Sequence, residues 1–348
     1  MAGTALTNPL TTSVSGMVST AISLDKTDKF DDVGRDGVIK VNAQNGTLVM
    51  NPSTCEFELR PHNKEDYLRN TCRAEFNPSP NPTPFWDAFL SDTVAGKALE
   101  ADKLKRQILS LIVEAATNGA LNSRKAFLLY GGTASGKSVL IDLIRATLGS
   151  ENTSSIDLGN FAVRFALAPM AQRGVLANLS SEMGAKEASA RVFKALSSGD
   201  EVMVDVKFSN PIHYCNRATL IFAGNQLPRL TDHSDASKER LTILPLVNTK
   251  AKELRNRSLY LMLLEEMDDI FSQAVLQYQE EYKRDKCTSI FENEGKAAEL
   301  SDRWQEESDS VMSWQNENIS ESETPTTSKA LYFDYGLWCK SAGVKYPV

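Results

Sequence analysis

The residues whose types and spacing could do chemistry are concentrated in one stretch, GGTASGKS at residues 131–138, which fits G-x-x-x-x-G-K-S/T without a gap. In this pattern the glycines let backbone N–H groups at a helix start point at phosphate oxygens, and the helix dipole adds positive potential. Lys137 would bridge the outer phosphates of a nucleotide, and the Ser138 hydroxyl would ligate Mg²⁺. A glycine turn with a surface lysine is the alternative. The predicted phosphate-binding residues are Gly131, Gly132, Thr133, Ala134, Ser135, Gly136, Lys137 and Ser138.

The segments on either side of this stretch would hold it in place. Residues 126–130 (AFLLY) form a short apolar run, which predicts a buried strand. Residues 139–148 have apolar positions at helical spacing, and Gly149 is a suitable helix end. The order strand, glycine loop, helix is the order that phosphate binding requires.

Three further residues stand at the ends of apolar runs that predict strands. Glu182 follows the run at 174–179, where a carboxylate would position the attacking water or hold magnesium. Asn225 follows the run at 218–223 and would hydrogen-bond the terminal phosphate of ATP. Arg240 precedes the run at 241–246 and would reach a neighbouring subunit's nucleotide. A glutamate at a helix start and a salt bridge at a strand start are the alternatives for Glu182 and Arg240.

Residues 201–214 predict a β-hairpin. Val202, Val204, Val206 and Phe208 alternate on one face, and the chain turns near residues 209–210, which places Lys207 close to the tip.

The segment before the glycine stretch predicts further elements. Residues 38–50 read as two short strands that turn at Asn45-Gly46, a favoured hairpin dipeptide. A helix carrying Phe85, Trp86 and Phe89 and an amphipathic helix at 102–116 follow, and we expect the aromatic residues to pack in the core.

Composition limits the class of protein. The chain has 348 residues and a net charge of −7, which argues against a broad basic DNA-binding face but permits contact through a few loops. It has no apolar stretch of membrane-spanning length, so no membrane partner is expected. The cysteines lack any C-x-x-C and predict free thiols in a reducing cytosol. They are Cys55, Cys72, Cys215, Cys287 and Cys339.

The ordered motifs YGGTASGKS, LANLSSEM, KALSSGDEVMVDVKF, IFAGNQLPRL and ERLTILPL resemble the helicase part of the phage and plasmid primase family, within superfamily 3 helicases. The resemblance covers about residues 38–340. It includes VNAQNGTLVMNP, PHNKEDYLRN and FWDAFL upstream, and LLEEMDDIFSQAV, RWQEESDSVMSW and LYFDYGLWCKSAG downstream.

This resemblance implies an α/β fold: a P-loop NTPase (AAA+-like) parallel sheet with helices on both faces, a helical N-terminal region and a partial winged-helix C-terminus. The expected parts are a flexible N-terminus (1–36), a mostly helical region (37–118), the ATPase core (119–250) and a C-terminal helical region with the partial winged helix (251–348). The implied activity is ATP-driven unwinding of forked duplex DNA by a homo-hexameric ring that moves on single strands, in the cytoplasm of a bacterial host during mobile-element replication.

The resemblance also implies roles for single residues. Glu182 matches the acidic Walker B position, Asn225 the sensor asparagine and Arg240 the arginine finger. Lys194 falls where a basic residue senses the neighbour's nucleotide, and Lys207 where a lysine grips the DNA backbone in the channel. Many superfamily 3 proteins have Asp-Glu at Walker B, whereas here Ser181 precedes Glu182. Mg²⁺ is therefore predicted on Ser138 and water, with Glu182 as the acidic residue beside it.

Two rival functions stay open. A small-molecule kinase would need a basic lid and an acceptor pocket, which the hairpin and the position of Arg240 do not suit. An ATP-gated DNA-binding or origin-remodelling switch would use the same ATPase residues without processive unwinding. We expect no primer synthesis, because no primase-like metal constellation precedes residue 38. The tail stops before a winged helix is complete, so we expect a fragment or a short form.

Overall fold

The structure is a computed structural model that describes residues 38–94, 98–117, 123–184, 187–231, 235–248, 258–308, 310–320 and 326–342. The predicted flexible N-terminus, residues 1–36, lies outside the described residues.

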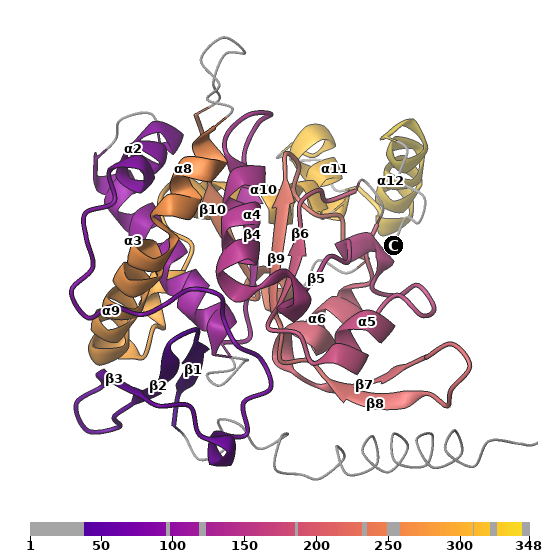
Figure 1. The fold of residues 1–348 in the computed structure, drawn as a ribbon. Coiled ribbons are helices and arrows are strands. Elements are labelled where there is room, and N and C mark those ends of the chain that lie inside the picture. The colour runs from indigo at the N-terminus through magenta and orange to yellow at the C-terminus, as the bar shows by residue number, and fades with distance from the viewer. Residues whose placement is uncertain are drawn as a thin grey trace, which may run out of the picture.

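A five-stranded parallel sheet occupies the centre of the fold, with the strand order β10-β4-β9-β6-β5 (Figure 1). The strands read as continuous apolar runs because both faces of a parallel sheet are covered by helices. The outermost strand next to β6 is short, since only residues 153 and 154 pair there. The strands are β4 (Ala126–Tyr130), β5 (Thr153–Ser154), β6 (Ala177–Ser180), β9 (Thr219–Gly224) and β10 (Leu241–Pro245).

Alternating side chains of the sheet enter two separate cores. Phe127 and Leu129 belong to one cluster of buried residues, and Ala126 and Leu128 belong to the other. The first core is built with α2 (Pro84–Thr93), α3 (Ala98–Ala116), α4 (Lys137–Leu148), α8 (Leu259–Glu265) and α9 (Met267–Asp285). The second is built with α5 (Ala168–Arg173), α6 (Ala190–Ser198) and α10 (Lys296–Ser308), and the short α7 (Asp235–Lys238) lies beside α6.

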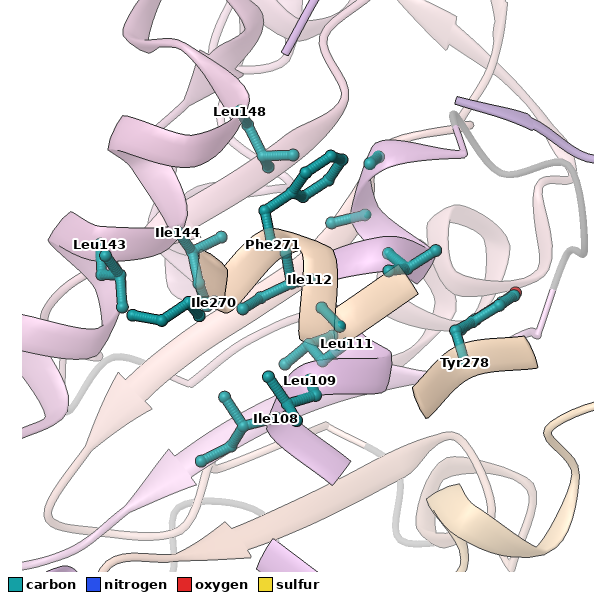
Figure 2. Packing of buried hydrophobic residues seen from close by; sticks show 14 of the residues in the cluster. Ile108, Leu109, Leu111, Ile112, Leu143, Ile144, Leu148, Ile270, Phe271 and Tyr278 are labelled. Carbon is teal, nitrogen blue, oxygen red and sulfur yellow. The ribbon is translucent and has the colours of Figure 1, made fainter. Parts of the chain in front are cut away.

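The first core fixes the helix that follows the glycine stretch. Figure 2 shows apolar side chains of α3, α4 and α9 meeting in one cluster. Ile112, Ile144 and Phe271 come from these three helices and are fully buried. Each such side chain contributes about 1.5–3 kcal/mol when it leaves water. The position of α4 is therefore set by long-range packing as well as by its own sequence.

An antiparallel sheet precedes the core, made of β1 (Lys40–Ala43), β2 (Gly46–Met50) and β3 (Phe57–Arg60). The predicted hairpin is confirmed, but it turns one residue earlier than expected, at Gln44-Asn45, because Gly46 is already paired with Ala43. The third strand was not predicted. The Phe57 N–H donates to Gln279 Oε1 at 2.6 Å, which attaches β3 to α9. The predicted helices with Phe85, Trp86 and Phe89 and at 102–116 are confirmed as α2 and α3. Trp86 and Phe89 are buried as expected, whereas Phe85 is 38% exposed, so its expected place in the core is wrong.

The predicted hairpin is also present, as β7 (Glu201–Val204) and β8 (Ile212–Cys215), which pair antiparallel. It projects from the body of the protein at the lower right of Figure 1. Phe208 differs from the prediction, because its side chain is 105% exposed rather than on the apolar face. The reason is local: strand pairing ends at Val204 and Ile212, and Phe208 takes a left-handed φ of 60° in the turn.

Helices make up the described part of the chain after β10. Beyond α8, α9 and α10 these are α11 (Ser310–Asn318) and α12 (Ser328–Ala342). The last two share a small core of Trp314, Tyr335 and Cys339. The described residues after Pro245 contain no strand, so the wing of the predicted winged helix is not among them. All five cysteines are unpaired thiols. Among the described helices none is both long and apolar enough to cross a bilayer.

Candidate nucleotide-binding site

The glycine stretch leaves the sheet at the carboxyl end of an inner strand, β4, which lies between β10 and β9. The Gly131 N–H donates to the Gly224 carbonyl at 3.1 Å, and the Leu246 N–H donates to the Tyr130 carbonyl at 2.7 Å. Both neighbouring strands therefore hold the start of the loop. A Cβ on Gly131 would lie 2.3 Å from the Leu246 carbonyl oxygen, so only glycine fits at this position.

Gly136 ends the loop and caps α4. Its φ of +94° is in the left-handed region, which favours glycine. A Cβ there would lie 2.6 Å from Cε2 of Phe89, a buried residue of α2. The loop is therefore packed directly against α2. The sequence did not identify this role of Phe89, because the contact joins segments that are distant in the chain.

Lys137 is the first residue of α4, and its ammonium group is held inside the loop. Nζ donates to the carbonyls of Gly131 and Gly132, each at 2.7 Å, and to Ser135 Oγ at 3.2 Å. Burial of the side chain lowers the pKa of Lys137. A cation at this position beside the first turn of a helix is the electrostatic environment that an anion requires.

The rest of the loop fits a triphosphate. Gly132, Thr133 and Ser138 are exposed, whereas Ser135 is buried beneath the lysine. Ala134 has a φ of +65°, so the backbone reverses direction here as well. The first N–H groups of α4 have no partner within the helix, which leaves them for phosphate oxygens. The Ser138 hydroxyl is available to Mg²⁺ in the same turn.

Glu182 and Asn225 lie, like the glycine loop, beyond the carboxyl ends of the parallel strands. β9 runs between β4 and β6, with Tyr130 paired to Gly224 and Ser180 paired to Phe222. Asn225 directly follows β9, and Glu182 lies two residues past β6; both side chains are exposed. The fold thus brings the glycine loop, Asn225 and Glu182 together at adjacent strand ends.

The segment around Glu182 is fixed by neighbouring groups. Ser180 Oγ donates to the Glu182 carbonyl at 3.0 Å. Asp157 accepts from the Gly184 N–H at 2.7 Å, and a Cβ on Gly224 would lie 3.1 Å from Met183 Cε. Asp157 is a supporting residue that the sequence analysis missed, and no local pattern indicated it. These contacts fix the backbone on both sides of Glu182.

Arg240 lies at the amino-terminal ends of the strands, opposite the ends at which the glycine loop, Asn225 and Glu182 lie. It precedes β10, and its carbonyl accepts from the Ala126 N–H at the start of β4, at 2.7 Å. Within a single chain, Arg240 and the glycine loop therefore lie at opposite ends of the sheet's strands. The physical reason is strand direction: in a parallel sheet, residues before and after strands lie at opposite edges.

Arg240 is bonded to α6, the helix that carries Lys194. The Arg240 guanidinium donates from Nε to Ser198 Oγ at 3.1 Å and from Nη1 to the Ala236 carbonyl at 2.6 Å. Ser198 and Lys194 are four residues apart on α6 and so share one face of that helix. The hydrogen bond between Arg240 and Ser198 therefore links Arg240 to the last turn of α6, one turn beyond Lys194.

Lys207 lies in the exposed turn of the β7–β8 hairpin. Its Nζ lies 5.9 Å from the centroid of the Phe165 ring, and Arg164 Cζ lies 4.8 Å from the same ring. Arg164 also pairs with Asp205 of the hairpin at 2.9 Å. The sequence analysis missed Arg164, Phe165 and the exposure of Phe208. Aromatic and basic residues side by side in both segments were a usable signal, because that combination is typical of single-strand binding.

Helix α10 contacts the sheet at the carboxyl ends of β4 and β9, where the glycine loop and Asn225 lie. Arg303 donates to the Tyr130 hydroxyl at 3.1 Å, and Trp304 Nε1 donates to the Pro228 carbonyl at 2.6 Å. Tyr130 directly precedes the glycine loop, and Pro228 lies in the loop that begins with Asn225. The α10 helix therefore connects the two loops that border the site.

A parallel sheet with helices on both faces and a glycine loop between its inner strand β4 and the helix α4 define the α/β fold of a P-loop NTPase, so the predicted fold class is confirmed. The chain is similar in sequence to two family models. One, described as a family of unknown function (DUF5906), matches residues 129–240, and the other, D5 N terminal like, matches residues 13–95. The first match begins within β4 and ends at Arg240.

A putative helicase of Acanthamoeba polyphaga mimivirus is 22% identical over 159 residues, which are 44% of this chain and 16% of that protein. The chain thus spans less than a fifth of the length of this relative. An apo structure of the NrS-1 C-terminal region is 12% identical with a TM-score of 0.43, over 91% of this chain and 82% of that one. A JCV helicase structure is 12% identical with a TM-score of 0.32, over 67% and 69%.

Proposed function

We propose that this chain is an ATP-dependent DNA helicase that acts as a homo-hexameric ring, hydrolysing ATP to move on single strands and to unwind forked duplex DNA. The observation that carries the proposal is the meeting of the glycine loop, Asn225 and Glu182 at three adjacent strand ends. The partial similarity to a putative viral helicase supports a helicase activity.

Each residue of the site has one chemical task in this proposal. The loop N–H groups and Lys137 bind the phosphates of ATP, and Glu182 orients and deprotonates the attacking water. Asn225 hydrogen-bonds the terminal phosphate and thereby detects whether it is still attached. Mg²⁺ would be held by Ser138 with Glu182 beside it, and when bound it neutralises charge on the phosphates.

The second half of the proposal is that hydrolysis needs a neighbouring subunit. Arg240 lies at the opposite ends of the strands from its own glycine loop, so in this proposal it serves the loop of the next copy, together with Lys194. A guanidinium placed there stabilises the negative charge that develops during phosphoryl transfer. A ring closes this head-to-tail arrangement so that every site is completed.

The β7–β8 hairpin is the proposed DNA contact. Lys207 would bind the phosphate backbone, and the exposed ring of Phe208 would stack on a base. Arg164 and Phe165 support the hairpin from the segment before α5. A contact limited to these loops is compatible with the chain's net charge of −7, because most of the surface need not approach DNA.

The test measures ATP hydrolysis with and without single-stranded DNA, and then strand displacement on a forked duplex. We expect DNA-stimulated hydrolysis, displacement, and loss of both in Lys137→Ala. The matched control is Lys329→Ala, which removes an exposed lysine of α12 and should change neither. Unaltered hydrolysis in Lys137→Ala would refute the phosphate loop. Stimulated hydrolysis without displacement would instead indicate the ATP-gated switch.

A further inference from the structure

Helix α8 is hydrophobic on every side. Its sequence, LYLMLLE, has six hydrophobic residues in a row, and of these only Leu263 is buried. Leu261 is 61% exposed. A helix at the surface of a globular protein carries polar residues on its outer side, whereas a helix that is hydrophobic all round is covered by other elements. The outer side of α8 is therefore typical of a helix that another polypeptide covers.

The inner side of α8 already has its partners. The helix packs against α2, α4 and α9, and Leu259 and Leu263 contact the first core (Figure 1). By contrast, Tyr260, Leu261 and Leu264 belong to none of the buried clusters that the described residues form. Leu264 is four residues from Tyr260 and three from Leu261, so the three side chains are neighbours on one face of the helix. We call this face, Tyr260, Leu261 and Leu264, the α8 surface.

A cavity of about 400 Å³ borders the α8 surface. Tyr260 lines it on one side, and α4 with the turn that follows α4 lines it on another. The charged groups of this cavity are paired with each other: Arg145 pairs with Asp142 at 2.7 Å, and Arg73 pairs with Glu151. A hydrophobic centre beside a polar rim is the composition of a protein–protein interface.

The α8 surface is continuous with the glycine loop. α8 packs against α4, which begins at Lys137, and against α2, whose Phe89 lies against Gly136. In the proposed ring, Arg240 of the next copy reaches this loop, so the loop is incomplete without a neighbour. A stable interface buries about 800 Å² on each partner, which is far more than the loop alone offers. A neighbour that reaches the loop therefore also covers the helices beside it.

We propose that the α8 surface is a contact between adjacent copies of this chain in the ring. This inference rests on the proposed function and deepens it, because it names a surface through which the neighbour is held beside the glycine loop. The three residues do not touch the nucleotide in this arrangement. Their substitution therefore weakens assembly and, through assembly, ATP hydrolysis, while a single chain keeps its affinity for the nucleotide.

The test uses Leu261→Asp in the full chain. Leu261 is exposed and lies in the first turn of α8, where an aspartate suits the helix dipole, so the fold should be kept. Analytical ultracentrifugation with a non-hydrolysable ATP analogue measures assembly, and ATP hydrolysis is followed against protein concentration. We expect both to need at least about tenfold more protein in Leu261→Asp, because a charge is then buried at the contact. Calorimetry should show unchanged affinity for the analogue.

Two further variants and a melting curve guard against a change in folding. Leu261→Gln adds no charge and should shift assembly in the same direction by a smaller factor. Leu337→Asp is the matched control, since Leu337 is an exposed leucine of α12, and it should assemble like the wild type. Thermal unfolding of single chains should be the same in all variants.

The outcomes separate the two proposals. Equal assembly of the wild type and both Leu261 variants would overturn the α8 contact while leaving the ring and the phosphate loop intact. An equal loss of assembly in Leu337→Asp would overturn it too, since the effect would then not be specific to α8. A wild-type protein that binds the analogue but stays a monomer would refute the ring and this contact together. A wild-type protein that assembles through Leu261 without binding the analogue would refute the nucleotide site and support the contact.

Discussion

Phe89 and Gly136 are in contact across two helices: a Cβ on Gly136 would come within 2.6 Å of the Phe89 ring. The ring cannot easily move aside, because Phe89 is buried in the larger core and packs against Trp86 in a tilted arrangement, with 5.9 Å between the ring centroids. The start of α2 is fixed as well, since Glu266 accepts the N–H groups of Phe85 and Trp86 at 3.0 and 2.9 Å. The shape of the phosphate loop therefore depends on a helix outside the loop.

Gly136→Ala should weaken both folding and nucleotide binding. A left-handed φ costs a residue with a Cβ about 1–2 kcal/mol, and contact with the Phe89 ring adds to that cost. Thermal unfolding and ATP binding of the variant would measure the two effects. Gly174→Ala is the control, because Gly174 has a φ of +64° but no atom within 4 Å of the added Cβ. Equal losses of stability in the two variants would refute the role of Phe89.

Phe208→Ala should weaken binding of single-stranded DNA without lowering stability. The ring is 105% exposed, so its removal costs no packing, while a stacked base contributes about 1–3 kcal/mol. Binding would be followed by fluorescence anisotropy with a labelled oligonucleotide. Met203→Ala is the control, since Met203 is 63% exposed on the same hairpin but lies on strand β7. Unchanged affinity in Phe208→Ala would exclude stacking on this ring.

Lys207→Ala should weaken the same binding through a different mechanism. A lysine that neutralises one phosphate contributes to the salt dependence of affinity, with a slope of about 0.7 per contact for single strands. We expect the slope to decrease in Lys207→Ala and to stay constant in Phe208→Ala, with basal ATP hydrolysis preserved in both. A titration of affinity against salt concentration measures this. Equal slopes in the wild type and Lys207→Ala would show that Lys207 does not contact phosphate.

The strand, loop and helix around Lys137 could be predicted from the sequence because each depends on neighbouring residues. An apolar run of five residues before Gly131 can only be buried, and Gly149 ends the helix where the apolar spacing stops. Glu182 and Asn225 each come after a predicted strand in the sequence, so in a parallel sheet both are expected at the carboxyl ends of the strands. These are local patterns or direct consequences of parallel pairing.

What the sequence could not predict depends on contacts between distant segments. The support of Gly136 by Phe89, the hydrogen bond from Gly184 to Asp157 and the attachment of Arg303 to Tyr130 each join separate elements. Phe208 was misplaced because alternation was extended past the last paired residue of β7, where the backbone turns. Periodicity describes a strand only as long as the strand continues.

The buried carboxyl group of Glu114 should make the free energy of unfolding depend on pH. Burial raises the pKa of this carboxyl group, while hydrogen bonds from Ser123 and Tyr278 lower it in part. Because the pKa of Glu114 is higher in the folded protein than in the unfolded chain, its protonated form stabilises the fold. This contribution to the free energy of unfolding is fully present below the unfolded pKa and is lost as pH rises through the folded pKa. Urea unfolding of the wild type should therefore show stability decreasing over that range.

Glu114→Gln should remove this decrease, because an amide has no proton to lose. Burial also raises the pKa values of the neighbouring Tyr278 and Cys287, so these groups stay neutral in the same range. Glu280→Gln on the exposed side of α9 is the control and should keep the wild-type profile. An unchanged profile in Glu114→Gln would assign the pH dependence to another group.

The position of Arg240 makes a prediction about mixed assemblies. Arg240 donates to Ser198 and Ala236 at the start of β10, whereas Glu182 lies past the end of β6, so the two cannot act on one nucleotide within one chain. Arg240→Ala and Glu182→Gln should each abolish ATP hydrolysis alone. A mixture of the two variants should recover part of it, because some interfaces then pair an intact arginine with an intact glutamate.

Lys238→Ala, which removes a nearby cation paired with Asp302, should need no such rescue. Hydrolysis that stays absent in the mixture would mean that Arg240 only anchors α6 to β10, and the site would then have to be completed by a different cation.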